Sequence, residues 1–232
     1  MKEIRNILVA IGLAFEDANL AWNNAKASVY AAAIETALAE GFTPVLVELV
    51  QDIENELLAQ CVVIDHHNQY VDRPASLLQV LNLLGIEPTR KQKLLAANDS
   101  GYIPAMLALG ASRKEVEEIR SLDWQAQGLT QKMITEALSA YAQAEVINGV
   151  IVVKMPQFTI APVTDAAFWD QPSQNLLLVV ADGRTVYFGD GEKCSQVHEA
   201  FKQGGWRGGN FVGNADPKLQ DKMVAYVLEL NE

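Results

Sequence analysis

The chain has 232 residues, of which 50% are hydrophobic and 20% charged, an ordinary composition for one large globular domain or two small ones. Its net charge of −11 at pH 7 repels polyanions, so we expect no long duplex nucleic acid as a partner and favour a small phosphorylated or nucleotide substrate. The apolar run at residues 7–13 is too short to span a membrane, and no signal-peptide cleavage pattern follows it, which predicts a cytoplasmic protein with no membrane partner. Cys61 and Cys194 lie far apart in the sequence and are expected to be free thiols.

The first part of the chain alternates between strand-like and helix-like segments. Residues 7–12 form a continuous apolar run typical of a buried parallel strand, and an Ala-rich helical stretch over about 19–40 follows. Residues 44–50, a short helical piece at 53–59 and a third apolar run at 61–64 repeat the alternation. Strands that alternate with helices predict a mostly parallel sheet flanked by helices.

From about residue 76 to residue 146 the pattern is helical, and we include this segment in a first domain of residues 1–146. Ser112 and Glu115 have the spacing of a capping box, which predicts a helix start there. The other helices expected in this segment cover residues 76–84, 89–97, 103–109 and 130–144.

After Asn148-Gly149 short β-rich runs follow one another, separated by turn signals such as Asp182-Gly183. We expect a second, smaller α/β lobe over residues 147–232, with one clear helix at about 195–203. The predicted fold class is therefore α/β, with a mostly parallel sheet in the first domain and a separate small lobe after it. The strands expected in the second lobe cover residues 150–153, 176–180 and 185–188.

The tripeptide Asp65-His66-His67 stands at the end of the apolar strand at residues 62–64. Because the carboxyl ends of strands in α/β sheets face the ligand crevice, these polar side chains are placed to bind a ligand. Imidazole nitrogens with a carboxylate suit Mn²⁺, Zn²⁺ or Fe²⁺, and Mg²⁺ less well. For an isolated His-His pair, a structural role at the strand end is the simpler interpretation.

The segment Val62-Val63-Ile64-Asp65-His66-His67-Asn68 resembles the DHH phosphoesterase superfamily, which is named after this tripeptide. That superfamily contains single-strand exonucleases, phosphodiesterases of oligonucleotides and cyclic dinucleotides, and manganese pyrophosphatases. A second family motif, an aspartate followed by a hydroxyl residue and glycine, is similar to Asp99-Ser100-Gly101. The resemblance implies that His66 and Asp99 bind a metal, that His67 faces the substrate phosphate with Asp65 supporting the cluster, and that Ser100 lies on the substrate side.

The first family motif, a histidine and two aspartates after the first strand, is matched only in part. Asp17 and Asn19 stand where the two aspartates belong, and Leu13 stands in place of the histidine. The family also has a bridging carboxylate after its second strand, for which Glu48 is the preferred candidate and Asp52 the alternative. A lone carboxylate in an apolar strand carries a desolvation cost unless it is paired or metal-bound, which favours Glu48.

A glycine-rich segment in the second lobe resembles the substrate-binding domain that many DHH proteins carry. Closely spaced glycines let backbone amides approach an anion, and the fork of Arg207 can hold phosphate through two hydrogen bonds. The alternative is a glycine-rich hairpin with Trp206 packed on the lobe. The substrate-binding candidates here are Gly204, Gly205, Arg207, Gly208 and Gly209.

These observations predict a metal-dependent phosphodiesterase or phosphatase-type hydrolase. Its expected substrate is a small phosphodiester or phosphoanhydride, such as a short oligonucleotide or a dinucleotide, bound in a cleft between the two lobes. The expected cofactor is a divalent metal, Mn²⁺ first, with Mg²⁺, Zn²⁺ or Fe²⁺ as alternatives. A second hypothesis is a catalytically degenerate relative that binds a nucleotide or metal as a regulatory protein, and a homodimer is left open.

Overall fold

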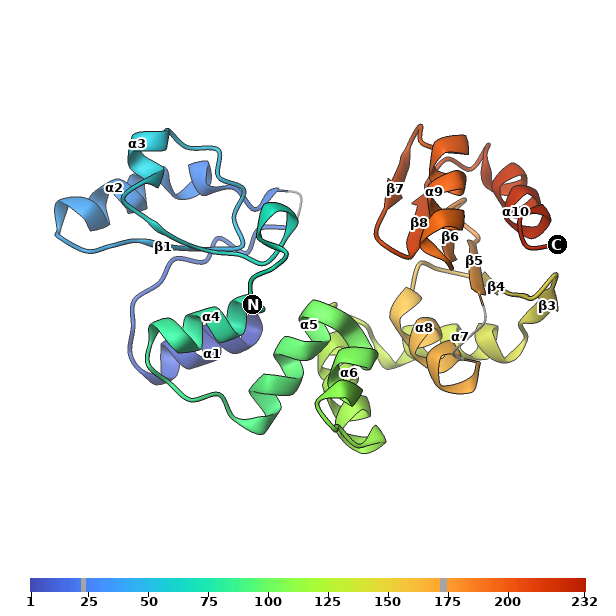
Figure 1. The fold of residues 1–232 in the computed structure, drawn as a ribbon, viewed down its shortest axis with the longest axis horizontal. Helices are drawn as coiled ribbons and strands as arrows, with labels where there is room; N and C mark the ends of the chain where they lie inside the picture. The colour runs from blue at the N-terminus through green and yellow to red at the C-terminus, as the bar shows by residue number, and fades with distance from the viewer. Residues whose placement is uncertain (22–23, 172–174) are drawn as a thin grey trace. The chain divides into compact units, whose positions relative to one another are not determined.

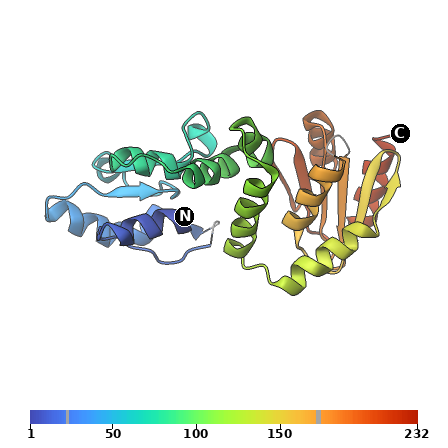
Figure 2. The same ribbon diagram turned by 90° about the horizontal axis from the view of Figure 1, so that it is seen from below.

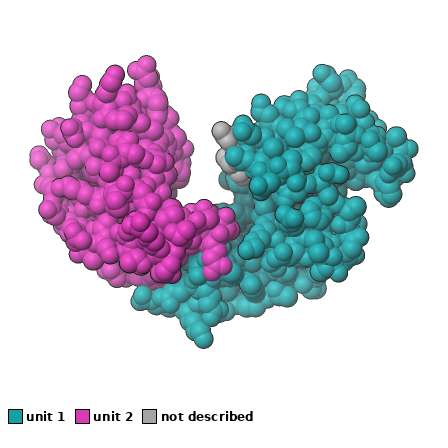
Figure 3. All heavy atoms as spheres, turned by 180° about the vertical axis from the view of Figure 1, so that it is seen from behind, with its two compact units in different colours: residues 1–123 teal, residues 124–232 magenta. Residues whose placement is uncertain are grey.

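The computed structural model describes residues 1–21, 24–171 and 175–232. The described chain forms two compact units, unit 1 (Met1–Asp123) and unit 2 (Trp124–Glu232), which Figure 3 shows in different colours. None of the helices in these ranges combines the length and apolarity that crossing a bilayer requires.

Unit 1 is mainly helical and contains one small sheet, in which β1 and β2 run parallel from the Val45–Val62 pair to the Val47–Ile64 pair. Helix α2 packs on the sheet through Ile34 and Leu46, and α1 and α4 pack around Ile64. The elements of unit 1 (Figure 1) are α1 (Lys2–Ala10), η2 (Ala27–Tyr30), α2 (Ala31–Ala39), β1 (Val45–Val47), α3 (Asn55–Leu58), β2 (Val62–Ile64), η3 (Asn68–Tyr70), α4 (Ser76–Leu83), α5 (Arg90–Ala108) and the first part of α6 (Arg113–Ala126).

The strand expected at residues 7–12 is not formed, because this run belongs to the helix α1 and the turn after it. Ile4 and Ile7 are buried three residues apart, at helical spacing, while Val9 and Ile11 are 62% and 48% exposed. A short apolar run can be a buried strand or one side of a helix, and the packing of Ile4 and Ile7 against α4 favours the helix here. Among the described residues, the sheet of unit 1 therefore has two strands.

The helices predicted between residues 76 and 126 are confirmed. Helix α5 begins with a capping box, in which the Thr89 hydroxyl accepts from the backbone of Gln92 and the Gln92 side chain accepts from the backbone of Thr89. Ser112 and Glu115 form the predicted capping box at the start of α6. The helix expected over about 19–40 is observed only in its later part, as η2 and α2, and its residues 22–23 lie outside the described residues.

The described residues of unit 2 form a mixed six-stranded sheet in the order β3-β4-β5-β6-β8-β7, and among these strands only β4 and β5 run parallel. The prediction of a mostly parallel sheet holds for β1 and β2 and not for this larger sheet. The elements of unit 2 (labelled in Figure 1, and seen from below in Figure 2) are α7 (Gln131–Ala142), β3 (Glu145–Ile147), β4 (Val150–Met155), α8 (Ile160–Asp170), β5 (Asn175–Val180), β6 (Thr185–Phe188), α9 (Gly191–Ala200), β7 (Gly205–Arg207), β8 (Phe211–Asn214) and α10 (Gln220–Glu229).

Helices cover both faces of the unit 2 sheet. Ile151 and Val153 of β4 pack in one apolar cluster with α7 and α8, whereas Val150 and Val152 pack in another with α9 and α10. Since successive residues of a strand point to opposite faces, an apolar residue is needed at almost every position. The lobe thus contains more helices than the one expected, and α9 begins earlier because the Asp190 carboxylate caps its first turn.

The compact units divide between Asp123 and Trp124, inside α6. Helix α7 lies beyond this division, and Ala137 and Tyr141 on it belong to the apolar cluster of unit 2. The boundary of functional domains expected at 146/147 stays a prediction. Cys61 and Cys194 are free thiols, as expected, and burial raises the pKa of both, so neither is favoured as a thiolate nucleophile.

Candidate metal centre

The parallel pairing of β1 and β2 brings two acidic positions to the same end of the small sheet. The Glu48 backbone N–H donates to the carbonyl of Ile64 over 2.9 Å, which continues the ladder one residue past β1. Glu48 and Asp65 thus follow directly after the paired ends of the two strands. This end of the sheet is where ligands bind in α/β folds.

Asp65 organises the tripeptide through a single carboxylate oxygen. Its Oδ1 accepts from the backbone N–H groups of His66 and His67, over 2.7 and 2.9 Å, and lies 2.8 Å from His67 Nδ1. A carboxylate offers only acceptors, so His67 donates from Nδ1 and presents Nε2 as the acceptor of its ring. This is the arrangement in which a carboxylate orients a metal-binding histidine.

His66 is buried, with 8% of its surface exposed, and has a carboxylate on each side of its ring. Its Nδ1 lies 3.6 Å from Glu48 Oε1, and its Nε2 lies 3.4 Å from Asp99 Oδ2. The Ser76 hydroxyl, at the start of α4, lies 3.1 Å from Nδ1 and can either donate to it or accept from it. The Ser76 backbone N–H also donates to Nδ1 over 3.4 Å, which favours Nδ1 as the acceptor of the ring.

Glu48 combines a strained backbone with a nearly buried carboxylate. Its φ of +53° lies in the left-handed region, which non-glycine residues adopt at a cost of about 1–3 kcal/mol. Its side chain is 11% exposed, so the carboxylate also loses hydration. Glu48 faces the ring of His66, where a bound cation would offset the cost of burying its carboxylate.

The ligand group of this centre is Glu48, His66 and His67, each of which offers an atom within 4.8 Å of the others. One carboxylate oxygen and two imidazole nitrogens fit Mn²⁺, Zn²⁺ or Fe²⁺, so the donor chemistry is suited to the expected ion. Asp99 adds a second carboxylate beside His66. The individual roles given to Asp65, His66, His67 and Asp99 in the sequence analysis stay predictions.

Asp99 lies next to a kink in α5, at Gly101 and Tyr102, whose backbone angles are not helical. A Cβ at Gly101 would lie 2.7 Å from the Cβ of Ala105, so only glycine fits this close approach. The kink also places Pro104 in the first turn of the continuing helix, where its missing N–H costs no hydrogen bond. The Ser100 hydroxyl donates to the Ala96 carbonyl over 3.0 Å, and its substrate role stays a prediction.

Asp17 and Asn19 are not part of the ligand group found among the described residues. The Asp17 carboxylate accepts from the Asn19 backbone N–H over 2.9 Å and from Arg5 over 3.4 Å, which makes a local turn. These residues follow the helix α1 instead of a strand, so no sheet carries them to the ligand end. Leu13, on the same segment, is 50% exposed.

Asp52, the alternative to Glu48, has a structural role. Its carboxylate accepts from the Ser28 backbone N–H over 2.9 Å and from the Ser28 hydroxyl over 2.7 Å. These hydrogen bonds lower the pKa of Asp52, the backbone one most strongly. Asp52 thereby fixes η2 beside the end of β1.

In unit 2 the glycine-rich segment forms the hairpin of β7 and β8, the alternative considered in the sequence analysis. Trp206 packs over Gly213, where a Cβ would lie 2.3 Å from the indole ring. Arg207 donates to the Ser195 hydroxyl over 3.1 Å and points to the Gly191 carbonyl, 3.4 Å away. The substrate-binding role of this segment stays a prediction. Gly204 has a φ of +75° before β7, Gly205 lies in β7, and Gly208 and Gly209 lie between the two strands.

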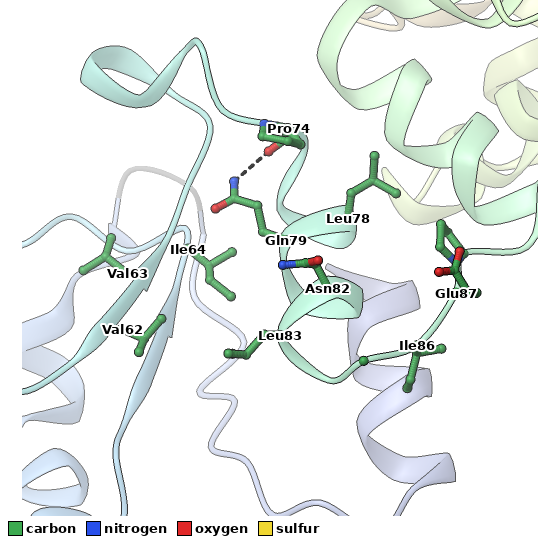
Figure 4. Close-up of a pocket in the computed structure, with 12 residues that line it drawn as sticks. Val62, Val63, Ile64, Pro74, Leu78, Gln79, Asn82, Leu83, Ile86 and Glu87 are labelled. Atoms are coloured by element: carbon green, nitrogen blue, oxygen red, sulfur yellow. Dashed lines mark hydrogen bonds between the residues drawn. The ribbon is translucent and has the colours of Figure 1, made fainter.

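A pocket of about 680 Å³ lies beside β2 in unit 1, between this strand and α4 (Figure 4). Its lining is mostly apolar and includes Val63, Leu78 and Ile86, and none of the candidate metal ligands is part of it. Gln79 connects this wall to the metal centre, since its side chain donates to the carbonyls of Pro74 and Asp65.

Comparisons with known proteins match only solved structures. No protein-family model and no curated protein sequence matches this chain. RecJ of Thermus thermophilus in complex with Mg²⁺ is 17% identical, with a TM-score of 0.35, over 68% of this chain and 23% of that chain. The DHH domain of a protein from a family of ribosomal proteins is 12% identical, with a TM-score of 0.44, over 86% of this chain and 66% of that chain.

An exopolyphosphatase-related protein from Bacteroides fragilis is 10% identical, with a TM-score of 0.48, over 88% of this chain and 76% of that chain. Of these three structures, one is described as a DHH domain. The chain spans less than two thirds of the first two structures, and similarity at these scores carries no substrate or residue role over to it.

Proposed function

We propose that this protein is a metal-dependent phosphoesterase that hydrolyses a small phosphodiester or phosphoanhydride. The observation that carries the proposal is the ligand group of Glu48, His66 and His67 at the carboxyl end of two parallel strands. Asp99 completes this group from α5, and Mn²⁺ is the proposed ion, with Zn²⁺, Fe²⁺ and Mg²⁺ as alternatives. When bound, the ion supplies Lewis-acid polarisation of a phosphoryl oxygen.

The protein's own groups have separable roles in this proposal. Asp65 holds Nδ1 of His67, so Nε2 is the ring nitrogen that is proposed to bind the ion. The burial of His66 between two carboxylates keeps its ring fixed. The net charge of −11 disfavours long polyanions and favours a short oligonucleotide, a dinucleotide or an inorganic phosphoanhydride. Ser100, Arg207 and the four glycines beside Arg207 are proposed for substrate binding.

The test is a hydrolysis assay on the full-length protein with Mn²⁺, using pyrophosphate, dinucleotides and an aryl phosphodiester as substrates. We expect turnover of at least one of them. We expect His66→Ala and Asp99→Ala to lower the turnover rate by a factor of about 100 or more, as the removal of a group that stabilises the transition state does. His198→Ala is the matched control, because His198 lies on α9 in unit 2. Mn²⁺ binding without turnover of any substrate contradicts the enzyme proposal.

A second candidate is a degenerate relative that binds a nucleotide or metal without turnover. It is favoured by the placement of Asp17 and Asn19 outside the ligand group. Nucleotide binding measured by calorimetry in the absence of hydrolysis supports this candidate. Turnover that depends on His66 excludes it.

A further inference from the structure

We propose that Arg120 is a positioning residue of the metal centre, which holds the kink of α5 in the form that presents Asp99 to His66. The inference rests on the proposed metal-binding function. It concerns a residue of α6, the helix that follows α5 in the chain (Figure 1).

The kink requires support from outside α5, because its backbone is not that of a helix. Gly101 has φ −160° and ψ 18°, and Tyr102 has φ 59° and ψ −150°. Tyr102 is therefore in a region that is almost confined to glycine and that persists only when surrounding contacts hold it. Asp99 lies in the last helical turn before this kink, and its side chain is half exposed, so packing of the side chain itself does little to fix it.

Arg120 contacts the residues on both sides of the Asp99-Ser100-Gly101 motif. Its Nη1 donates to Asn98 Oδ1 over 3.0 Å, and its guanidinium carbon lies 4.7 Å from the centre of the Tyr102 ring. The same nitrogen donates to Asp123 over 2.6 Å, which orients the guanidinium from its own helix. One cation thus holds the residue before the motif by a hydrogen bond and the strained residue after it by a cation–π contact.

The burial of Arg120 separates it from the ordinary surface ion pairs of this helix. Only 6% of Arg120 is exposed, and a buried guanidinium is tolerated where its donors are satisfied. Arg113 on the same helix pairs with Glu117, and both side chains are more than half exposed. Arg113 therefore provides a matched control for the loss of an arginine–carboxylate pair on α6.

The experiment measures the binding of Mn²⁺ alone to the full chain by electron paramagnetic resonance, with folding checked by circular dichroism. We expect Arg120→Met and Asn98→Ala to raise the Kd for Mn²⁺ about 10–100-fold, the range for residues that orient metal ligands. Arg120→Lys, which keeps the charge without the planar fork, is expected to fall between Arg120→Met and wild type. Arg113→Met is expected to bind as wild type does.

A double-mutant cycle distinguishes positioning from general stabilisation. If Arg120 acts through Asp99, Arg120→Met adds no further loss of Mn²⁺ affinity in the Asp99→Ala background. A full additional loss in that background, or a folded Arg120→Met that binds Mn²⁺ as tightly as wild type, overturns the inference while leaving the metal centre in place. If Arg120→Met does not fold, the same two measurements are made with Asn98→Ala. An unchanged Mn²⁺ affinity, or a full additional loss in the Asp99→Ala background, then overturns the inference. A wild-type chain that binds no Mn²⁺ overturns both this inference and the proposed function.

Discussion

Asp65 accepts two backbone hydrogen bonds and one contact from His67 through the same oxygen, so the geometry of the histidine pair depends on this atom. The rings of His66 and His67 lie 4.1 Å apart and are inclined by 41°, which leaves little freedom for either ring to turn alone. A change at Asp65 therefore acts on both histidines without removing either.

Asp65→Asn is expected to weaken Mn²⁺ binding by about 10–100-fold, because the amide lacks the charge that holds His67 Nδ1–H. The protein is expected to remain folded, since the amide oxygen still accepts from the backbone. Calorimetric titration with Mn²⁺ measures the effect, and Asp72→Asn, an exposed acid in the following loop, is the control. An unchanged affinity in Asp65→Asn would show that His67 does not need this carboxylate.

Glu48 is a residue at which stability and function are expected to oppose each other. Glu48→Gly removes the strain of a positive φ and the burial of a carboxylate, at the cost of greater freedom of the unfolded chain. We expect the metal-free variant to be more stable by about 1 kcal/mol and to lose Mn²⁺ binding. Urea unfolding without metal measures the first effect. Glu48→Gln, which keeps the strain, should show the loss of binding without the full gain in stability.

At the scale of elements, one acidic side chain joins the starts of two helices. Glu115 completes the capping box of α6 with Ser112 and also accepts from Arg90, the first residue of α5, over 3.0 Å. The Arg90 hydrogen bond and the two from Ser112 lower the pKa of Glu115 from 4.5 to about 2. A carboxyl with a depressed folded-state pKa stabilises the fold above its unfolded pKa and loses this contribution as pH falls through the folded value.

The stability contribution of Glu115 is therefore expected to be fully present above about pH 4.5 and to disappear as the pH approaches 2. Urea unfolding of wild type and Glu115→Gln should differ at pH 6 and converge as the pH is lowered through this window. Glu118→Gln, an exposed glutamate on the same helix, provides the comparison. A difference between wild type and Glu115→Gln that stays constant from pH 6 to pH 2 contradicts this account.

The elements predicted correctly are those whose signals are local. The helix start at about residue 89, the capping box at Ser112, the strand before Asp65 and the strands β4, β5 and β6 of unit 2 all depend on residues within a few positions of each other. Residues 7–12 were predicted wrongly because their apolar pattern suits a strand and a helix equally, and contacts with α4 decide between them. Helix α8 was missed because its apolar residues are spread around the helix and no single apolar stripe stands out, whereas α10 buries Met223 and Val227 four residues apart and could have been predicted.

The same distinction applies within the metal centre. The sequence indicates Glu48 through the family resemblance and its place in an apolar run, and the structure brings it near the histidines because it follows β1, which pairs with β2. Arg120 could not be found in this way, because it reaches Asn98 across 22 positions and has the appearance of any charged residue on an amphipathic helix. Asp17 and Asn19 are not in the ligand group because residues 7–12 before them form a helix and a turn, not the predicted strand.

At the scale of the whole molecule, we expect Mn²⁺ binding to stabilise one of the two compact units and not the other. All proposed ligands, Glu48, His66, His67 and Asp99, belong to unit 1. Saturation with Mn²⁺ at 100 times its Kd is expected to stabilise the state that binds it by about 2.7 kcal/mol. Hydrogen exchange measured on peptides should therefore slow in β1, β2, α4 and α5 and stay unchanged in unit 2, and His66→Ala should remove the effect. Protection within unit 2 would mean that its groups also take part in binding the ion.

The position of Asp99 in the chain determines when, during translation, all the proposed metal ligands have been synthesised. It is the last of the proposed ligands in the sequence, and more than a hundred residues follow it. Since ribosomes add about 5–20 residues per second and domains fold as they emerge, roughly 10 seconds pass between the synthesis of Asp99 and that of Glu232. The helix that carries Arg120 follows within this interval, so unit 1 can take up its ion on the ribosome before unit 2 has been made.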